Sequence, residues 1–345
     1  MKKTALFFFI VLLFFSKTAL SYPLKPTDKN FLKPYCQGST DFENFTLTKV
    51  PQKIDIETIN VRKWYINLFR AIKSLGVRFE RLAGSKRIDR KTKKFHSAKL
   101  TAYYENGIKC IFKARIRIHG SSGDHISFSK FVTSMRVNLI DGNILHRSQF
   151  ILYLPQARGG NNEVFMTTLL KELNLLAPLT FPITVKVNEN EPVKFLFQEK
   201  IAGILLSTNN RRNGIIMAAN KNSQIIETMN AESRPRKYSL NLGRVIWGEN
   251  LGNKVIIKAL DKLNYLYLQT LGYGNGIKMS GQEILKRDTT FLQLKKDYFQ
   301  EDLTGFENIS VFDAIMVATG GLHGLTTEDR RFYYDPVYDR LEPIY

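Results

Sequence analysis

The sequence contains few of the residues that build metal clusters. Its 345 residues include two cysteines, Cys36 and Cys110, and five histidines scattered along the chain. Zinc sites need several such ligands at short, regular spacings, so the sequence predicts no zinc site. The cysteines leave two alternatives open. They form a disulfide, or Cys110 is a buried free thiol on the apolar side of an expected strand.

Long apolar runs are also missing, except at the start of the chain. Lys2 and Lys3 precede an apolar run over residues 4–15, and residues 19–21 (ALS) fit a small-x-small cleavage site. This pattern predicts a signal peptide over residues 1–21 and a mature start at Tyr22. The alternative is an uncleaved anchor, for which the run is short, because a span needs about 20 residues. We therefore expect an exported protein, located in a periplasm, at the cell surface or outside the cell.

Acidic residues are scarce relative to basic ones. The chain has 31 Asp and Glu against 51 Lys and Arg, a formal charge of +20, and removal of the signal with its three lysines leaves +17. Such a charge favours anionic partners. Because export separates the protein from nucleic acid, we expect a membrane surface, an anionic surface polymer or a phosphate-bearing ligand instead. The alternative is a solvated basic surface with no partner, and the sequence indicates no oligomeric state.

Periodicity predicts an α+β fold, with a mostly antiparallel sheet in the first half and helices in the second. Residues 22–97 contain an extended arm over 22–40, a helix over 61–75 and a basic segment over 78–94. An Asn106-Gly107 turn joins the strands of a first hairpin. The expected strands are 98–105, 108–118, 133–139, 149–154, 183–187 and 193–199, and the later helices are 161–176, 251–271 and 310–319. Residues 221–250 are polar and predict an irregular insertion.

Three of these strands carry candidate site residues. Residues 108–118 alternate between an apolar side and a basic side that includes Arg117, and they lead into a loop rich in hydrogen-bond donors. Arg136 lies on the polar side of the strand over 133–139. Glu199 ends the apolar side of the strand over 193–199. Such a carboxylate needs a partner or a cation if it is buried, unless the strand frays there and the side chain reaches water.

The end of the chain has a distinct order of elements. A helix over 310–319 precedes a loop with His323, and an aromatic hairpin follows, formed by strands over 331–334 and 341–345. Together with three earlier stretches, this order resembles the spore-coat protein H (CotH) kinase family. The four stretches are 114–122 (ARIRIHGSS), 134–139 (SMRVNL), 195–200 (FLFQEK) and 323–345.

The resemblance implies an atypical kinase that uses ATP and Mg²⁺ on a protein substrate, with a sheet-rich lobe over 98–200 and a helical lobe over 201–345. It implies His323 and Asp329 as catalytic residues. It also implies a set of residues for the cofactor, which are Arg117, Ser121, Arg136 and Glu199. We expect Arg136, Glu199 and His323 to converge on one site.

The sequence departs from the family at three points. Val132-Thr133 stand where the family has a lysine, and no Asp adjoins His323. The family's metal-binding Asp follows the Pro-Ile-Tyr motif, which here is residues 343–345, so no metal ligand is identified. We expect either a truncated kinase or a pseudokinase that binds nucleotide phosphate but transfers it poorly. The alternative function is a non-catalytic extracytoplasmic protein that binds or assembles an anionic surface polymer or a protein coat.

Overall fold

The structure is a computed structural model that describes residues 35–38, 46–76, 87–219, 225–229, 235–239, 243–274, 303–325 and 329–345. The expected signal peptide and residues 77–86 of the basic segment lie outside this part of the chain. The main helices are α3 (Val61–Gly76), α4 (Asn161–Glu172), α5 (Gly203–Thr208), α6 (Asn253–Gly274) and α8 (Leu303–Ala318). None of the described helices is long and apolar enough to span a membrane.

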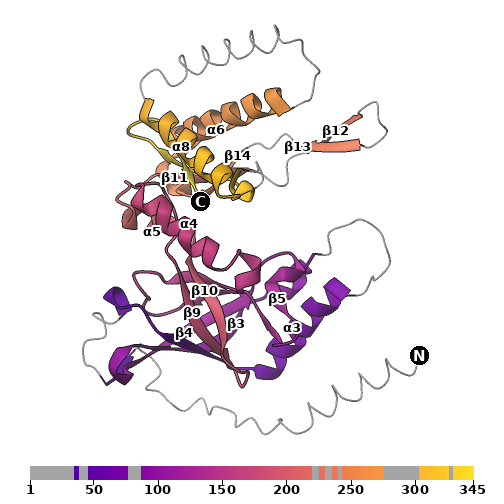
Figure 1. Ribbon diagram of the computed structural model, residues 1–345, viewed down its shortest axis with the longest axis vertical. Coiled ribbons are helices and arrows are strands. Elements are labelled where there is room, and N and C mark those ends of the chain that lie inside the picture. The colour runs from indigo at the N-terminus through magenta and orange to yellow at the C-terminus, as the bar shows by residue number, and fades with distance from the viewer. Residues whose placement is uncertain are drawn as a thin grey trace.

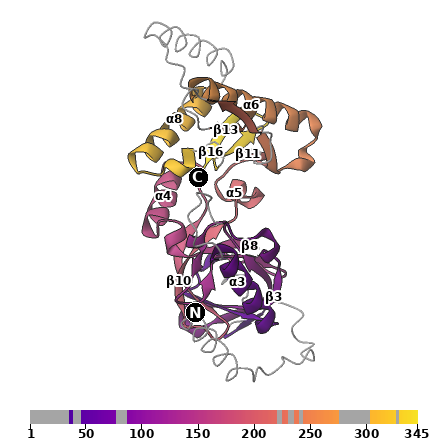
Figure 2. The same ribbon diagram turned by 90° about the vertical axis from the view of Figure 1, so that its right-hand side faces the viewer.

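Seven strands of the first half close into a barrel, which forms the lower part of Figure 1 and Figure 2. Their order is β4-β3-β2-β9-β10-β8-β7, and β7 pairs back onto β4. Every pair is antiparallel except β2 with β9. The expected α+β class is confirmed, and so is a mostly antiparallel sheet in the first half. The bounds are β2 (Lys53–Thr58), β3 (His96–Tyr103), β4 (Lys109–Ile118), β7 (Met135–Leu139), β8 (Gln149–Tyr153), β9 (Thr180–Val187) and β10 (Val193–Glu199).

Alternating apolar residues fill the barrel. In β4 every second residue is buried, from Cys110 to Ile118, and the intervening basic residues lie on the outer side. Helix α3 packs onto the same core through Trp64 and Leu68. Its first turn is capped by Asn60, whose Oδ1 accepts a hydrogen bond of 2.8 Å from the Lys63 backbone N–H.

The barrel contains one strand that the sequence analysis did not identify. Strand β2 lies between the expected arm and the expected helix, where no element was predicted, and it joins β3 to β9. Without it the sheet could not close. Residues 53–58 read KIDIET, and Ile54 and Ile56 are fully buried, so an alternating pattern was present in a short segment.

The second half contains a four-stranded sheet as well as helices. Its order is β14-β11-β15-β16, and α6 and α8 pack on its core. The expected irregular insertion is wrong for the described residues, because they form β12, β13 and β14. Figure 1 shows the β12–β13 ribbon projecting from the body. The bounds are β11 (Ile215–Ala219), β12 (Ile225–Met229), β13 (Pro235–Ser239), β14 (Gly243–Trp247), β15 (Arg331–Asp335) and β16 (Arg340–Ile344).

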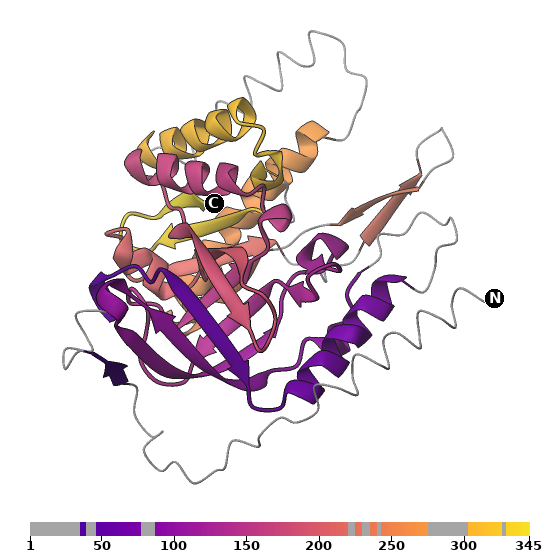
Figure 3. The ribbon, with the colours of Figure 1, turned by 60° about the horizontal axis from the view of Figure 1, so that its bottom comes forward.

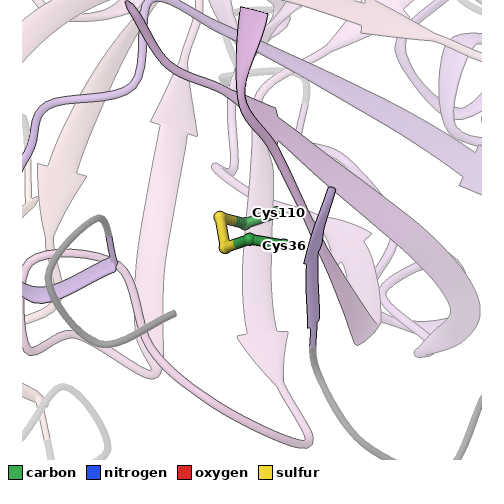
Figure 4. The surroundings of a disulfide bond; sticks show 2 residues. All are labelled: Cys36 and Cys110. Atoms are coloured by element: carbon green, nitrogen blue, oxygen red, sulfur yellow. A yellow bond between two sulfur atoms is a disulfide. The ribbon is translucent and has the colours of Figure 1, made fainter. Parts of the chain in front are cut away.

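The cysteines form a disulfide, which decides between the two alternatives (Figure 4). Cys36 lies in the short strand β1 (Tyr35–Gln37), directly opposite Cys110 of β4. Strand β1 pairs with the first residues of β4, and β7 pairs with residues 114–118 of the same strand. The bond therefore fixes β1 onto the wall of the barrel.

Candidate anion-binding site

Four half-buried basic residues gather on the outer side of the barrel wall. Arg117 of β4 lies directly opposite Arg136 of β7. Arg136 lies opposite Ile151 of β8, which lies opposite Gln198 of β10. Directly paired residues project to the same side of a sheet, so Arg117 and Arg136 both point outward. Lys200 shares a hydrogen-bond acceptor with Arg136, and the charge of Arg117 acts on Lys93. We call Arg117, Arg136, Lys200 and Lys93 the basic face.

Hydrogen bonds link two members of the basic face through one amide. The Oε1 atom of Gln149 accepts from Arg136 Nη2 and from Lys200 Nζ, both at 2.9 Å. Arg136 Nε donates to Asn138 Oδ1 at 3.1 Å. A single neutral acceptor therefore holds two cationic side chains together.

No carboxylate of the described residues forms an ion pair with any of the four. Burial lowers the pKa of Arg136, and the charge of Arg117 lowers it further. Burial also lowers the pKa of Lys200, followed by the charges of Arg136 and Arg117. The pKa of Lys93 is lowered by burial, then by Arg117 and Arg90. Like charges at this spacing repel one another, and a bound anion would relieve that repulsion.

Arg117 has an unused donor at the centre of the basic face. Its guanidinium lies over the ring of Phe95, 5.0 Å from the ring centroid. Its Nε atom is buried and has no hydrogen-bond partner among the described atoms. A buried donor without an acceptor costs about 1–3 kcal/mol, so the protein alone does not satisfy the Arg117 guanidinium.

A second cluster adjoins the basic face at the end of β4. The Tyr153 hydroxyl lies 3.2 Å from His119 Nε2 and accepts a hydrogen bond of 3.1 Å from Arg158 Nη2. The Arg158 guanidinium also lies over the Tyr153 ring, 4.7 Å from the centroid. His125 packs on the same ring, with centroids 5.9 Å apart. This aromatic cluster holds Arg158 in a fixed orientation.

His119 of this cluster stays neutral at physiological pH. Burial lowers its pKa to about 3, and the nearby His125, Arg158, Lys93 and Arg117 act in the same direction. The neighbouring Gly120 has a φ of +89°, and the His125 ring occupies the place that a side chain would take. Only glycine fits both requirements, which fixes the turn after β4.

The C-terminal half contributes one more cation. Burial lowers the pKa of Arg331 in β15. The positive charge of Arg158 adds to this shift, whereas Tyr153 and Asp329 act against it. Arg331 is thus near Tyr153 and Arg158 of the barrel. The proposed catalytic residue Asp329 is exposed and lies near this cation. The backbone of His323 lies in a 3₁₀ turn (Leu322–Leu325), and its side chain lies outside the described part of the structure.

Glu199 and Arg136 do not share a site. In the strand register Arg136 is in line with Gln198, whereas Glu199 is in line with Phe150 and points into the barrel. Glu199 is buried and forms an ion pair with Arg147 at 3.0 Å, and its Oε2 accepts from the Leu179 backbone N–H at 3.1 Å. The expectation that Arg136 and Glu199 converge is therefore wrong, because neighbouring residues in a strand face opposite sides.

The described residues contain no preformed cluster of metal ligands. Both carboxylate oxygens of Glu199 are used by Arg147, and no group of three or more His, Cys, Asp or Glu side chains gathers elsewhere in the described ranges. Phosphate oxygens do fit the basic face, since guanidinium and ammonium groups are their usual partners. Ser121, also expected to bind cofactor, is exposed, and its carbonyl accepts from the Ile88 backbone N–H at 2.8 Å.

Two of the four basic-face residues could be predicted from the sequence. Arg117 and Arg136 stood out because each lies on the polar side of an alternating strand. Lys200 had a weaker signal, as the residue after the strand-ending Glu199, and Lys93 was one of many cations in a basic segment. Tyr153 and Arg158 had none, because β8 and the following turn meet β4 only in the folded barrel.

No protein-family model matches the chain, and no curated protein matches its sequence.

Proposed function

We propose that this is an exported, non-catalytic protein that binds a phosphate-bearing ligand, such as a nucleotide, on the basic face. The observation that carries the proposal is the pair Arg117 and Arg136, directly opposite each other and without a carboxylate partner in the described chain. The unused Nε donor of Arg117 supports it. The disulfide supports export, because structural disulfides are typical of oxidising compartments.

Each group of the site would have a distinct part in binding. Arg117 and Arg136 would contact the phosphate oxygens, and Gln149 would keep Arg136 and Lys200 beside each other. Because Arg117 stacks on Phe95, the Arg117 guanidinium has a fixed orientation before the ligand binds. Arg158, held by Tyr153, would contact a second phosphate or the remainder of a larger ligand.

The test is a titration of the mature protein with phosphate, pyrophosphate and ATP, followed by calorimetry and thermal unfolding. We expect each anion to raise the melting temperature, because a ligand that binds only the folded state stabilises it. Arg117→Met keeps the apolar stem on Phe95 and removes the charge. It should weaken binding at least tenfold, since a charge-assisted hydrogen bond contributes about 1.5–3 kcal/mol.

Lys109→Met is the matched control, because Lys109 is exposed at the other end of the same strand. It should leave anion affinity unchanged. If both variants lose the same affinity for the anion, binding depends on the overall positive charge of the protein and not on the basic face. The absence of any anion effect on the wild-type protein would contradict the proposal.

A CotH-like kinase is the second candidate, favoured by the order of the four sequence stretches and by a sheet-rich half followed by a half with helices. It requires Mg²⁺ to strengthen ATP binding and a γ-phosphoryl group to reach a protein acceptor. For the 345-residue chain we expect ATP affinity to be independent of Mg²⁺, and no transfer. Transfer that Mg²⁺ supports and that His323→Ala abolishes would favour the kinase instead.

A further inference from the structure

Helix α3 has an exposed side that the barrel leaves uncovered. Its inward side is buried in the core through Trp64, Leu68 and Leu75. On the outward side two large apolar side chains reach solvent, Ile66 with 41% and Phe69 with 45% of their surface exposed. Figure 3 shows α3 along the outer edge of the barrel.

Basic residues surround this apolar pair. Arg62 and Lys73 lie in the same stripe as Ile66 and Phe69, because positions four, seven and eleven residues apart share one side of a helix. Lys63 and Arg70 are also exposed and flank the stripe. The helix contains no acidic residue. We call these six residues the α3 surface: Arg62, Lys63, Ile66, Phe69, Arg70 and Lys73.

The α3 surface is held rigidly. The Asn60 cap fixes the start of the helix, and Asn67 in its middle donates to the Thr92 carbonyl at 2.6 Å. The stacking of Tyr65 on Phe131, with centroids 5.7 Å apart, ties a further side of the helix to the barrel. The exposed residues therefore form a preformed surface on the folded protein.

We propose that the α3 surface binds the surface of a bilayer that contains anionic lipid. Basic residues around an exposed aromatic and aliphatic pair are typical of helices that lie at the membrane interface. The cations would approach lipid phosphates, while Ile66 and Phe69 would enter the boundary between headgroups and acyl chains. A soluble anionic polymer would use the cations but would leave the apolar pair in water, so the pair favours the membrane.

The test is co-sedimentation of the mature protein with vesicles of phosphatidylcholine alone or with added phosphatidylglycerol. We expect binding to the anionic vesicles only. Ile66→Ser with Phe69→Ser should reduce the partition coefficient about tenfold or more, and so should Arg70→Gln with Lys73→Gln. All four positions are exposed, so the variants should fold, which far-ultraviolet circular dichroism and phosphate-induced stabilisation would verify.

Matched controls remove the same groups elsewhere. Val311→Ser with Val317→Ser removes two exposed apolar side chains from α8, and Lys194→Gln with Lys254→Gln removes two exposed charges. Both control pairs should bind vesicles as the wild type does. The inference is overturned if the wild type ignores anionic vesicles, or if the controls lose as much binding as the α3 variants.

Two further results identify another mode of binding. If the apolar variant keeps full vesicle binding and only the charge variant loses it, α3 recognises anionic polymers or headgroups by charge alone. If Arg117→Met removes vesicle binding while the α3 variants keep it, the basic face is the lipid contact. The first result would contradict the insertion of Ile66 and Phe69 into the bilayer, and the second would contradict docking through α3 altogether. Neither would affect the titration of free phosphate.

Discussion

The barrel wall carries charged side chains on both of its sides, and their surroundings differ. On the inner side Glu199 and Arg147 are buried together and form an ion pair at 3.0 Å. On the outer side Arg117 and Arg136 are half-buried beside each other with no carboxylate of the described chain between them. The inner charges therefore stabilise the fold as a pair, whereas the outer charges are arranged for a ligand of opposite sign.

Removing one member of the inner pair should destabilise the protein strongly. Glu199→Leu would leave the Arg147 charge buried without its partner, which costs about 3–5 kcal/mol. Adding Arg147→Met should recover most of that lost stability. The part not recovered comes from the hydrogen bond that the Leu179 N–H donates to Glu199. The free energy of unfolding in urea measures both effects. A single variant as stable as the wild type would show that Arg147 finds other partners.

His119 should make stability depend on pH. Its pKa is about 3 in the folded protein against about 6.5 in the unfolded chain, so below pH 6.5 the unfolded state takes up a proton that the folded state does not. The stability is complete above pH 6.5 and falls as the pH drops toward 3. By pH 5 the loss from this residue is about 2 kcal/mol.

Urea unfolding of the wild type and of His119→Gln, at neutral pH and at pH 5, measures this contribution. The variant should lose less stability between the two pH values. His125 is retained as an internal control, since burial lowers its pKa as well and its contribution remains in both proteins. Identical pH dependence in the two proteins would show that His119 is charged in the folded state.

At the scale of elements, α4 connects the barrel to the second half of the chain. The Glu163 carboxylate accepts from Gln198 Nε2 in β10 at 2.6 Å and from the Tyr345 hydroxyl at 2.7 Å. Burial raises the pKa of Tyr345, and so does Glu163. Leu176 continues the connection through a bridge to Ile344. One buried carboxylate thus holds a helix, a barrel strand and the residue after β16.

Glu163→Ala should loosen this junction. It would remove the acceptor of the Tyr345 hydroxyl and one of the two acceptors of Gln198 Nε2, which also donates to Thr180 Oγ1 at 3.2 Å. The loss of the Tyr345 acceptor alone should cost about 1–3 kcal/mol. Glu163→Gln keeps one acceptor oxygen and should cost less. Urea unfolding measures the stability, and hydrogen exchange at residues 163–176 and 341–345 shows whether the loss is local. Unchanged exchange in Glu163→Ala would show that apolar packing alone holds the junction.

Local patterns in the sequence predict most elements but few of their contacts. The Asn106-Gly107 turn and the alternation in β4 identify a hairpin, because both signals lie within one short segment. Closure of the barrel depends on β2 with β9 and on β7 with β4, which are pairings between distant segments. Arg117 meets Arg136 through the β4–β7 pairing, and Glu199 meets Arg147 where β10 pairs with β8. The sequence therefore predicts Arg117, Arg136 and Glu199 as candidates but not their contacts.

At the scale of the whole molecule, the excess of 51 basic over 31 acidic residues acts in two directions. It attracts anions over distances longer than a hydrogen bond, and it destabilises the compact state through self-repulsion. Salt screens both effects, with a Debye length of about 10 Å at 0.1 M.

Added sodium chloride should therefore raise the free energy of unfolding of the ligand-free protein while weakening its affinity for pyrophosphate. Urea unfolding and calorimetry across a salt series measure the two trends. Arg117→Met should show a smaller gain in stability from salt than the wild type, because one repulsive pair is already gone. Pyrophosphate affinity that is independent of salt would contradict an electrostatic basic face.

The Cys36–Cys110 bond also determines how the molecule would carry a mechanical load. The bond closes a loop whose ends are 74 residues apart, and this loop contains β2, α3 and β3. When the chain is stretched from residues before Cys36, the force passes through the two sulfurs into β4, and the enclosed segment bears no tension. In single-molecule stretching, the unfolded length should be shorter by about 250 Å, at about 3.4 Å per residue, and a reductant should restore it. Helix α3, which lies in the enclosed segment, would thus bear no tension when the chain is pulled at its two ends.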